Sequence, residues 1–370
     1  MRLKTLKFMD YDSEMTRRVK MKILKKILIF TMFLFVVTAI RANCNQNTIS
    51  TRSRVIEGKP VKVGVLLYRF DDAYISLVRQ SLEQIQKENE GKVEFAFYDG
   101  KNDQSIQNES LDTLLEKKDV DLLLLNLVDT KSTKEAINKI KQNNIPVLLF
   151  NREPVDIEAV KSYKKSYFLG TDAKEAGVLQ GKILINAWNN NKAVIDKNRD
   201  KIMQYIMLMG ERDNLEAIER TKYSVLTINN AGIKTQELAI RICDWNEEEA
   251  KNVTKTLFAQ FGNKIEAIIS NNDSMAIGAI KSLQEYGYNN GDKTKTIPVV
   301  GVDAIPEAQE LIKKGFMTGS ALQDPSAMAK ALYTVGMNLV YNKNPLDGTE
   351  YKFDDTGVAI RLPYEEYTIK

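Results

Sequence analysis

The stretch VKVGVLLYRFDDAY, from Val61 to Tyr74, decides the fold class. Its apolar half, Val61–Leu67, has the composition of a buried β-strand, and the chain then takes up the apolar spacing of a helix at Ile75, Val78, Leu82 and Ile85. In open α/β sheets, ligands bind at the carboxyl ends of the strands, where the connecting loop lies. This loop carries two carboxylates and three aromatic rings. A pyranose offers hydroxyls to a carboxylate and a C–H face to a ring, so the loop predicts a sugar site with Asp72 and Tyr74 as candidates.

Apolar runs of strand length recur along the chain and alternate with amphipathic helical patterns. The run DLLLLN at residues 121–126 is apolar on both faces, which is typical of a parallel strand covered by helices on both sides. Repeated β-α units predict doubly wound sheets, and their number favours two α/β lobes. Helices are predicted over Lys131–Gln142, Glu175–Trp188 and Asp324–Asn342. The predicted strands are Val61–Leu67, Val93–Tyr98, Leu122–Leu125, Val147–Phe150, Tyr167–Leu169, Ile202–Leu208, Ala267–Ser270, Pro298–Val302 and Val358–Leu362.

The composition excludes several classes of function. The chain has 370 residues, and its formal charge of +4 comes from the N-terminal part, because residues 1–54 hold 12 of the 53 Lys and Arg but only 3 of the 49 Asp and Glu. The remainder is mildly acidic, so we expect no nucleic-acid partner. The chain contains no histidine, which removes the commonest general base and metal ligand. Only Cys44 and Cys243 occur, too few for a disulfide framework.

The N-terminus predicts export. Lys25 and Lys26 precede an apolar run of 14 residues, Ile27–Ile40, which Arg41 ends. This length suits the core of a signal peptide better than a transmembrane helix. We expect residues 1–42 to be a signal peptide or a membrane anchor and residues 43–60 to be a polar tether. Cleavage after Ala42, retention as an anchor and lipidation at Cys44 remain alternatives for an extracytoplasmic protein.

Polar residues recur where the predicted strands end. Asn126 follows one strand, Asp303 follows another, and Asn271, Asn272 and Asp273 stand together before a helix. Each of them has a simpler interpretation as a helix N-cap. Capping alone does not require amides and carboxylates on successive strands, however. Planar Asn and Asp groups can bond adjacent sugar hydroxyls, which favours a sugar site at this edge of the sheets.

Two other features have alternative interpretations. Trp245 lies in the polar context CDWNEEEA, which favours a cleft, although a lone Trp is more often part of a core. Arg220 follows Glu216 at helical spacing, and the simpler interpretation there is a surface ion pair.

The segment DKNRDKIMQ predicts a calcium loop. It places oxygen-bearing groups at positions 1, 3, 5, 7 and 9 of an EF-hand-like pattern, with a backbone carbonyl at position 7: Asp196, Asn198, Asp200, Ile202 and Gln204. Met207 stands where the pattern needs a glutamate, and Lys201 stands where it needs a glycine. A solvated Asp/Asn turn is an equally good interpretation of the segment by itself.

The order of the motifs YRFDDAY, KNDQSIQN, NLVD, FNREP, GTDAKEAG, NNDSMAIGA and GVDAIPEA resembles the glucose/galactose-binding proteins among the type I periplasmic solute-binding proteins. The resemblance runs from about Val61 to Tyr364. It implies two Rossmann-like lobes with parallel sheets, joined by a three-crossover hinge near Pro146–Phe150, Gln323–Pro325 and Arg361–Pro363. The N-terminal lobe is then residues 61–150 plus 324–362, and the C-terminal lobe is residues 151–323 plus 363–370.

The same resemblance implies a set of sugar contacts and a complete calcium site. Tyr74 and Trp245 cover the two faces of the ring, and Glu266 supplies the last ligand of the Ca²⁺ loop. Three positions depart from the family pattern, since Asn214 replaces a histidine, Glu216 an aspartate and Gln323 an asparagine. The implied sugar-binding residues are Asp72, Tyr74, Asn126, Asn214, Glu216, Arg220, Trp245, Asn272, Asp303 and Gln323.

The resemblance implies a receptor that closes on glucose or galactose and presents it to the permease of an ABC transporter. A sugar-sensing subunit of a membrane sensor kinase or chemoreceptor is the alternative. A glycosidase that uses Asp72 and Glu216 as paired carboxylates is a further class. The family is not hydrolytic, and sugar hydroxyls account for the carboxylates, so we expect no enzyme. A repressor of the same fold needs an N-terminal DNA-binding motif, where this chain has an export segment.

Overall fold

The computed structural model describes Met15, Met21 and residues 59–369. The chain divides into two units, Met1–Ser53 and Arg54–Lys370, and both sheets belong to the second. Apart from Met15 and Met21, the predicted signal segment, residues 1–42, lies outside the described residues. Cys44 and nearly all of the predicted tether also lie outside them. Within the described residues, no helix combines the length and the apolar character that crossing a membrane requires.

The first sheet has six strands, all parallel, in the order β11-β5-β4-β3-β1-β2. The second sheet also has six strands, in the order β12-β10-β9-β8-β6-β7, and only β12 is antiparallel to its neighbour. The strands of the first sheet are β1 (Val61–Leu67), β2 (Val93–Asp99), β3 (Leu122–Leu125), β4 (Val147–Phe150), β5 (Ser166–Thr171) and β11 (Ala359–Leu362). Those of the second are β6 (Ile202–Met209), β7 (Lys234–Ile242), β8 (Ala267–Ser270), β9 (Val299–Asp303), β10 (Gly319–Leu322) and β12 (Glu365–Tyr367).

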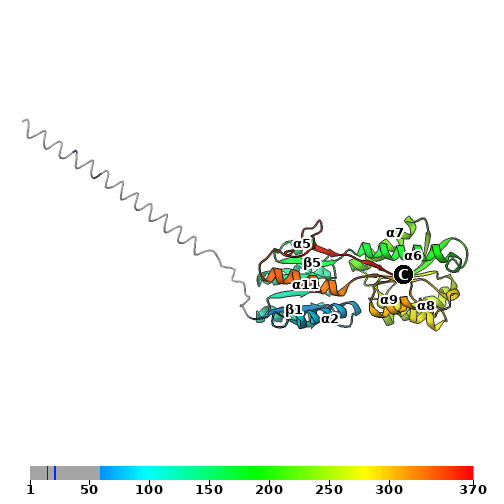
Figure 1. Ribbon diagram of the computed structural model, residues 1–370, viewed down its shortest axis with the longest axis horizontal. Helices are drawn as coiled ribbons and strands as arrows, with labels where there is room; N and C mark the ends of the chain where they lie inside the picture. Colours follow the sequence, from blue (N-terminus) through cyan, green and yellow to red (C-terminus); the bar gives the residue numbers. More distant parts are fainter. Residues whose placement is uncertain (1–14, 16–20, 22–58, 370) are drawn as a thin grey trace, which may run out of the picture. The chain divides into compact units, whose positions relative to one another are not determined.

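Helices cover both faces of each sheet (Figure 1). In the first lobe, α2 and α11 pack on one face and α3, α4 and α5 on the other. In the second lobe, α8, α9 and α10 pack on one face and α6 and α7 on the other. The helices are α2 (Ala73–Glu88), α3 (Gln104–Lys117), α4 (Thr133–Gln142), α5 (Ile157–Lys161), α6 (Ala173–Ile195), α7 (Leu215–Asn230), α8 (Glu247–Phe261), α9 (Asp273–Glu285), α10 (Pro306–Lys313) and α11 (Pro325–Val340).

Strand β3 shows why the apolar runs specify this fold. Leu122 and Leu124 belong to the core on one face of the first sheet, and Leu123 and Leu125 belong to the core on the other. All four side chains are at most 1% exposed. Burying a leucine contributes about 1.5–3 kcal/mol, so such a strand is stable only between two helical layers. The prediction of doubly wound α/β lobes is confirmed.

The chain passes between the sheets in three places, and one of them differs from the prediction. The predicted crossovers near Gln323–Pro325 and Arg361–Pro363 lie where β10 leads into α11 and where β11 leads into β12. The predicted crossover at Pro146–Phe150, and with it the lobe boundary at residue 150, is wrong. Strand β5 pairs with β4, so the first sheet extends to Thr171 and the crossover follows it. The apolar pattern of β5 fits either sheet, because both sheets bury their strands on both faces.

Candidate functional site

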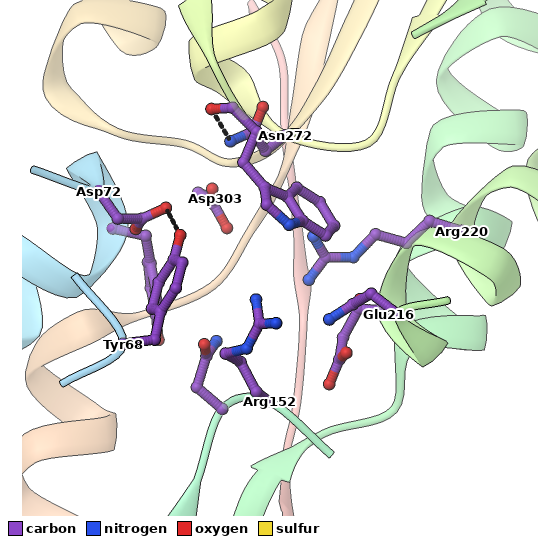
Figure 2. A pocket seen from close by; sticks show the side chains of 11 residues that line it. Tyr68, Asp72, Arg152, Glu216, Arg220, Asn272 and Asp303 are labelled. Atoms are coloured by element: carbon purple, nitrogen blue, oxygen red, sulfur yellow. Dashed lines mark hydrogen bonds between the residues drawn. The ribbon is translucent and has the colours of Figure 1, made fainter. Parts of the chain in front are cut away.

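A pocket lies between the two lobes at the carboxyl ends of the strands (Figure 2). The loops after β1 and β4 line it from the first lobe, and the loops after β6, β7, β8 and β9 line it from the second. This placement agrees with the general rule for open α/β sheets. The lining residues are Tyr68, Asp72, Tyr74, Asn151, Arg152, Asn214, Glu216, Arg220, Trp245, Asn272 and Asp303.

Asp72 uses its two oxygens for different purposes. Oδ1 accepts a 2.8 Å hydrogen bond from the Ile75 amide and thereby caps α2. Oδ2 accepts a 2.5 Å hydrogen bond from the Tyr68 hydroxyl at the pocket wall, as Figure 2 shows. The side chain therefore serves both as a helix cap and as an acceptor in the pocket.

The predicted aromatic platforms, Tyr74 and Trp245, both reach the pocket. Trp245 is 8% exposed and adopts a left-handed backbone with φ 63°. Its indole lies against Gly210, where a Cβ atom would come within 2.3 Å of the ring. Burial raises the pKa of Tyr74 well above its ordinary value. Each platform thus presents a neutral ring that carries one polar donor group.

Glu216 and Arg220 do not form the surface ion pair that their spacing suggests. Both side chains are buried, with exposures of 7% and 4%. Glu216 Oε1 accepts a 2.7 Å hydrogen bond from the Glu153 amide of the first lobe. Arg220 donates 2.8 Å and 2.9 Å hydrogen bonds to the Asn271 carbonyl and the Tyr364 hydroxyl. Burial raises the pKa of Glu216, and the backbone hydrogen bond and Arg220 oppose that rise.

Asn272 and Asp303 complete the second-lobe wall. Asn272 caps α9 through its Oδ1 atom, which accepts from the Met275 amide at 3.0 Å. Asp303 ends β9 with φ 111°, a strained value for a residue other than glycine. Burial raises the pKa of Asp303 well above its ordinary value, while Arg220 opposes and the neighbouring Asp273 adds to that rise.

Asp273 does not cap its helix. It lies in the first turn of α9, fully buried, where its carboxylate accepts 2.9 Å and 2.7 Å hydrogen bonds from the Ile305 amide and the Ser320 hydroxyl. Burial is the main cause that raises its pKa from 3.8 to about 7.

This raised pKa predicts a pH-dependent stability. The folded state holds the Asp273 proton more tightly than the unfolded chain, so the stabilisation is complete below about pH 4 and is lost as the pH rises through about 7. We expect the wild-type free energy of unfolding to fall from pH 5 to pH 8, and we expect Asp273→Asn to show a shallower fall. Urea unfolding at several pH values measures both slopes. If wild type and Asp273→Asn show the same pH dependence of the free energy of unfolding, Asp273 is not its cause.

The pocket brings together eight of the ten predicted sugar-binding residues. The other two lie close by without lining it. Asn126 is fully buried and bonds the Tyr68 amide and the Phe150 carbonyl at 3.2 Å and 3.0 Å, so it fixes the two first-lobe loops. Gln323 accepts a 3.3 Å hydrogen bond from the Tyr364 hydroxyl at the second crossover.

Sequence reasoning missed three lining residues, Tyr68, Asn151 and Arg152. Tyr68 belongs to the loop that revealed Asp72, and Asn151 and Arg152 directly follow β4. The rule that found Asn126 and Asp303, a polar residue at a strand end, would have found Asn151 and Arg152 as well.

Unpartnered polar atoms are concentrated around the pocket. Thirteen buried side-chain nitrogen or oxygen atoms among the described residues have no protein hydrogen-bond partner. Buried polar atoms almost always have partners, so each of these atoms is free to bond a water, an ion or a ligand. Five of the thirteen belong to lining residues: Tyr74 Oη, Arg152 Nε, Glu216 Oε2, Arg220 Nε and Trp245 Nε1.

The predicted calcium loop also contains buried polar atoms without hydrogen-bond partners. Asp196 Oδ1 and Gln204 Oε1 are buried acceptors without partners. Glu266, 1% exposed, accepts hydrogen bonds from the Lys197 and Gln204 amides at 2.7 Å and 3.1 Å, which holds its carboxylate at the loop. Among the described residues, no three His, Cys, Asp or Glu side chains gather closely enough to form a metal site by themselves. A site here needs the amide and carbonyl oxygens as well.

Comparison with known proteins agrees with this geometry. Residues 63–344 match the family described as periplasmic binding protein domain. The D-galactose/methyl-galactoside binding periplasmic protein MglB of Haemophilus influenzae is 38% identical over 304 residues, which cover 82% of this chain and 88% of the relative. The xylitol-binding protein of Mycolicibacterium smegmatis is 23% identical over 280 residues, which cover 75% of this chain and 72% of the relative.

A solved structure shares the fold at lower identity. The ABC transporter solute binding protein from Bacillus halodurans, with bound myo-inositol, aligns with a TM-score of 0.69 at 22% identity and covers 85% of this chain and 96% of its own. The matched family and the relative at 38% identity both span most of the chain. The chain therefore belongs to the periplasmic binding proteins, in their type I sugar-binding family.

Proposed function

We propose that the protein binds one monosaccharide, galactose or glucose, between its lobes and delivers it to an ABC transporter permease. The observation that carries this proposal is the set of five unpartnered buried polar atoms around a pocket that three aromatic residues, Tyr68, Tyr74 and Trp245, also line. A hexose supplies hydroxyls to the unpartnered polar atoms and a C–H face to the aromatic rings. As a member of a family of binding proteins, the chain is not an enzyme.

Galactose is the first choice because the Haemophilus influenzae relative is described as a D-galactose and methyl-galactoside binding protein. The pocket has no surplus of cationic side chains over carboxyl groups, which supports a neutral sugar. Asp72, Glu216 and Asp303 face only two cations, Arg152 and Arg220, among the lining residues. A uronic acid would add a further carboxylate to this acidic set and should be excluded.

Binding and closure are linked because each lobe supplies part of the pocket. Asp72 and Tyr74 come from the first lobe, and Glu216, Trp245 and Asn272 come from the second. A sugar contacts both sets only when the lobes are closed, so its differential affinity shifts the population to the closed state. The permease would recognise that state.

Export to the outer face of the membrane fits this role, because the Haemophilus influenzae relative is a periplasmic protein. The signal peptide or anchor proposed for residues 1–42 would bring the protein there. A sensor kinase or chemoreceptor is the alternative partner. Neighbouring genes for an ATPase and a permease would support transport, and genes for a histidine kinase and a response regulator would support sensing.

We also propose that Asp196, Asn198, Asp200, Ile202, Gln204 and Glu266 hold Ca²⁺. The unpartnered Asp196 Oδ1 and Gln204 Oε1 support this proposal, because oxygen is the ligand that calcium prefers. Bound calcium would fix the loop between α6 and β6 to the start of β8. Lys201 opposes the site in two ways, since it adds a cation and holds a left-handed backbone with φ 65°.

Removal of calcium is expected to destabilise the protein. A site saturated about 100-fold above its Kd contributes about 2.7 kcal/mol, and for a protein of this size such a loss lowers the Tm by about 4 °C. Thermal unfolding in EDTA and in excess calcium measures the difference. Lys201→Gly is expected to tighten calcium binding, because glycine favours the observed φ and the cation is gone. A Tm that neither EDTA nor calcium changes would refute the site.

Thermal unfolding against a ligand panel tests the sugar proposal. We expect galactose or glucose to raise the Tm, and we expect ribose, xylitol, myo-inositol and galacturonate at equal concentration to raise it less. A rise only with a polyol or a uronic acid would contradict the proposed ligand class.

A further inference from the structure

Arg152 lies at the meeting point of the pocket and the two lobes. It follows β4 in the first lobe, lines the pocket and is 7% exposed. Its guanidinium carbon lies 4.6 Å from the centre of the Tyr68 ring. Its Nε is buried without a partner. Figure 2 shows the side chain reaching in between Tyr68 and Glu216.

The other end of the guanidinium bonds to both lobes. Nη2 donates 2.9 Å to the Val128 carbonyl in the first lobe and 2.6 Å to Glu211 Oε2 in the second, directly beyond β6. Nη1 donates a 3.4 Å hydrogen bond to Glu211 Oε1. The two guanidinium nitrogens thus bond the two oxygens of one carboxylate, a bidentate arrangement or fork. Glu211 does not line the pocket itself.

The residue next to Arg152 fixes the same loop. Glu153 accepts 2.5 Å and 2.7 Å hydrogen bonds from Arg361 of β11, which tie the loop to the first lobe. Its amide donates to Glu216 Oε1 in the second lobe. The backbone of this loop is therefore held firmly, and Arg152 projects from a rigid base.

We propose that Arg152 couples occupation of the pocket to closure, by contacting the sugar on one side and latching Glu211 on the other. This inference rests on the proposed sugar-binding function. A sugar hydroxyl at Nε would hold the guanidinium in the orientation that the Glu211 fork requires. The Arg152–Glu211 latch in turn would hold the closed lobes around the sugar. The sugar contact and the latch would therefore both slow the release of the sugar.

A second lobe-bridging ion pair provides the control. Lys131 Nζ of the first lobe lies 2.8 Å from Asp213 Oδ2 of the second, but these side chains are 58% and 67% exposed. Exposed pairs contribute little. Glu211→Gln and Asp213→Asn each remove one carboxylate from a bridging pair, and neither residue lines the pocket.

The test measures sugar association and release by stopped-flow tryptophan fluorescence with the full-length chain. We expect Glu211→Gln to speed galactose release about tenfold at an unchanged association rate, and Asp213→Asn to stay within about twofold of wild type. Arg152→Lys keeps the charge but loses the fork, and it should speed release by more. In the double variant, the effects of Arg152→Lys and Glu211→Gln should not add. Equal release from wild type and Glu211→Gln would overturn the inference.

A ligand-free measurement separates this inference from the proposed function. Double electron–electron resonance measures the distance between two spin labels, one on an exposed helix of each lobe. The distribution of this distance reports the fraction of molecules that are closed. We expect that population to fall in Glu211→Gln and to stay unchanged in Asp213→Asn. If wild type binds no sugar but this difference persists, the proposed ligand fails and the latch stands. If neither variant changes the population, the latch fails.

Discussion

Asp72→Asn is expected to weaken galactose binding by about 100-fold, which corresponds to about 2.7 kcal/mol. The asparagine oxygen can still accept from the Ile75 amide and cap α2. The amide nitrogen replaces Oδ2, so the acceptor that now serves the Tyr68 hydroxyl is lost. Hydrogen bonds to a charged group contribute about 1.5–3 kcal/mol, which sets the size of the effect. Calorimetric titration measures the loss.

Asp103→Asn is the matched control for this variant. Asp103 caps α3 in the same lobe by accepting from the Ser105 and Ile106 amides, and it does not line the pocket. Both variants should lower the Tm by similar small amounts, while only Asp72→Asn weakens binding. Unchanged galactose affinity in Asp72→Asn would show that this carboxylate does not contact the sugar.

Gly210→Ala is expected to weaken galactose binding by about 50-fold without removing any polar group from the pocket. The added methyl group would lie 2.3–2.4 Å from ring atoms of Trp245, so the indole must move. Loss of a well-packed aromatic contact costs 2 kcal/mol or more at a binding hot spot, which sets this magnitude. Overpacking should also cost about 1–3 kcal/mol of unfolding free energy.

Gly319→Ala separates destabilisation from displacement of the ring. Its methyl group would lie 2.8 Å from Thr368 and 3.0 Å from Ile183, in the second lobe but away from the lining residues. We expect a comparable loss of stability with normal galactose affinity and normal tryptophan emission. If Gly210→Ala binds galactose as wild type does, the Trp245 ring is not a sugar platform.

The sequence was informative where burial dictates residue type. The leucines of β3 had to be apolar on both faces, and that pattern predicted a parallel strand between helical layers. Polar residues at strand ends, such as Asp303, were equally easy to recognise. Strands that are buried on both faces are apolar, so polar residues stand out where such a strand ends. These two signals were sufficient for the doubly wound lobes and for Asp72, Asn272 and Asp303 in the pocket. Asn214, Glu216 and Arg220 were expected as sugar contacts only from the family resemblance.

The sequence was uninformative where the outcome depends on distant partners. Strand β5 fits either sheet, so its pairing with β4 could not be read from its own residues. Strand β7 lies at a sheet edge and is largely exposed, so it lacks an apolar run and was missed. Arg152 looks like a surface residue in FNREP, and only the fold brings it to Glu211. Spacing suggested a surface pair for Glu216 and Arg220, which the fold buries instead.

We propose above all that the pocket between the lobes holds a single hexose. Calorimetric titration of the full-length protein with D-galactose, at two temperatures, tests it most directly. We expect one sugar per chain, a Kd in the micromolar range or tighter, and a negative heat-capacity change from burial of the sugar face against Trp245 and Tyr74. The absence of binding to galactose and to glucose at both temperatures would contradict it.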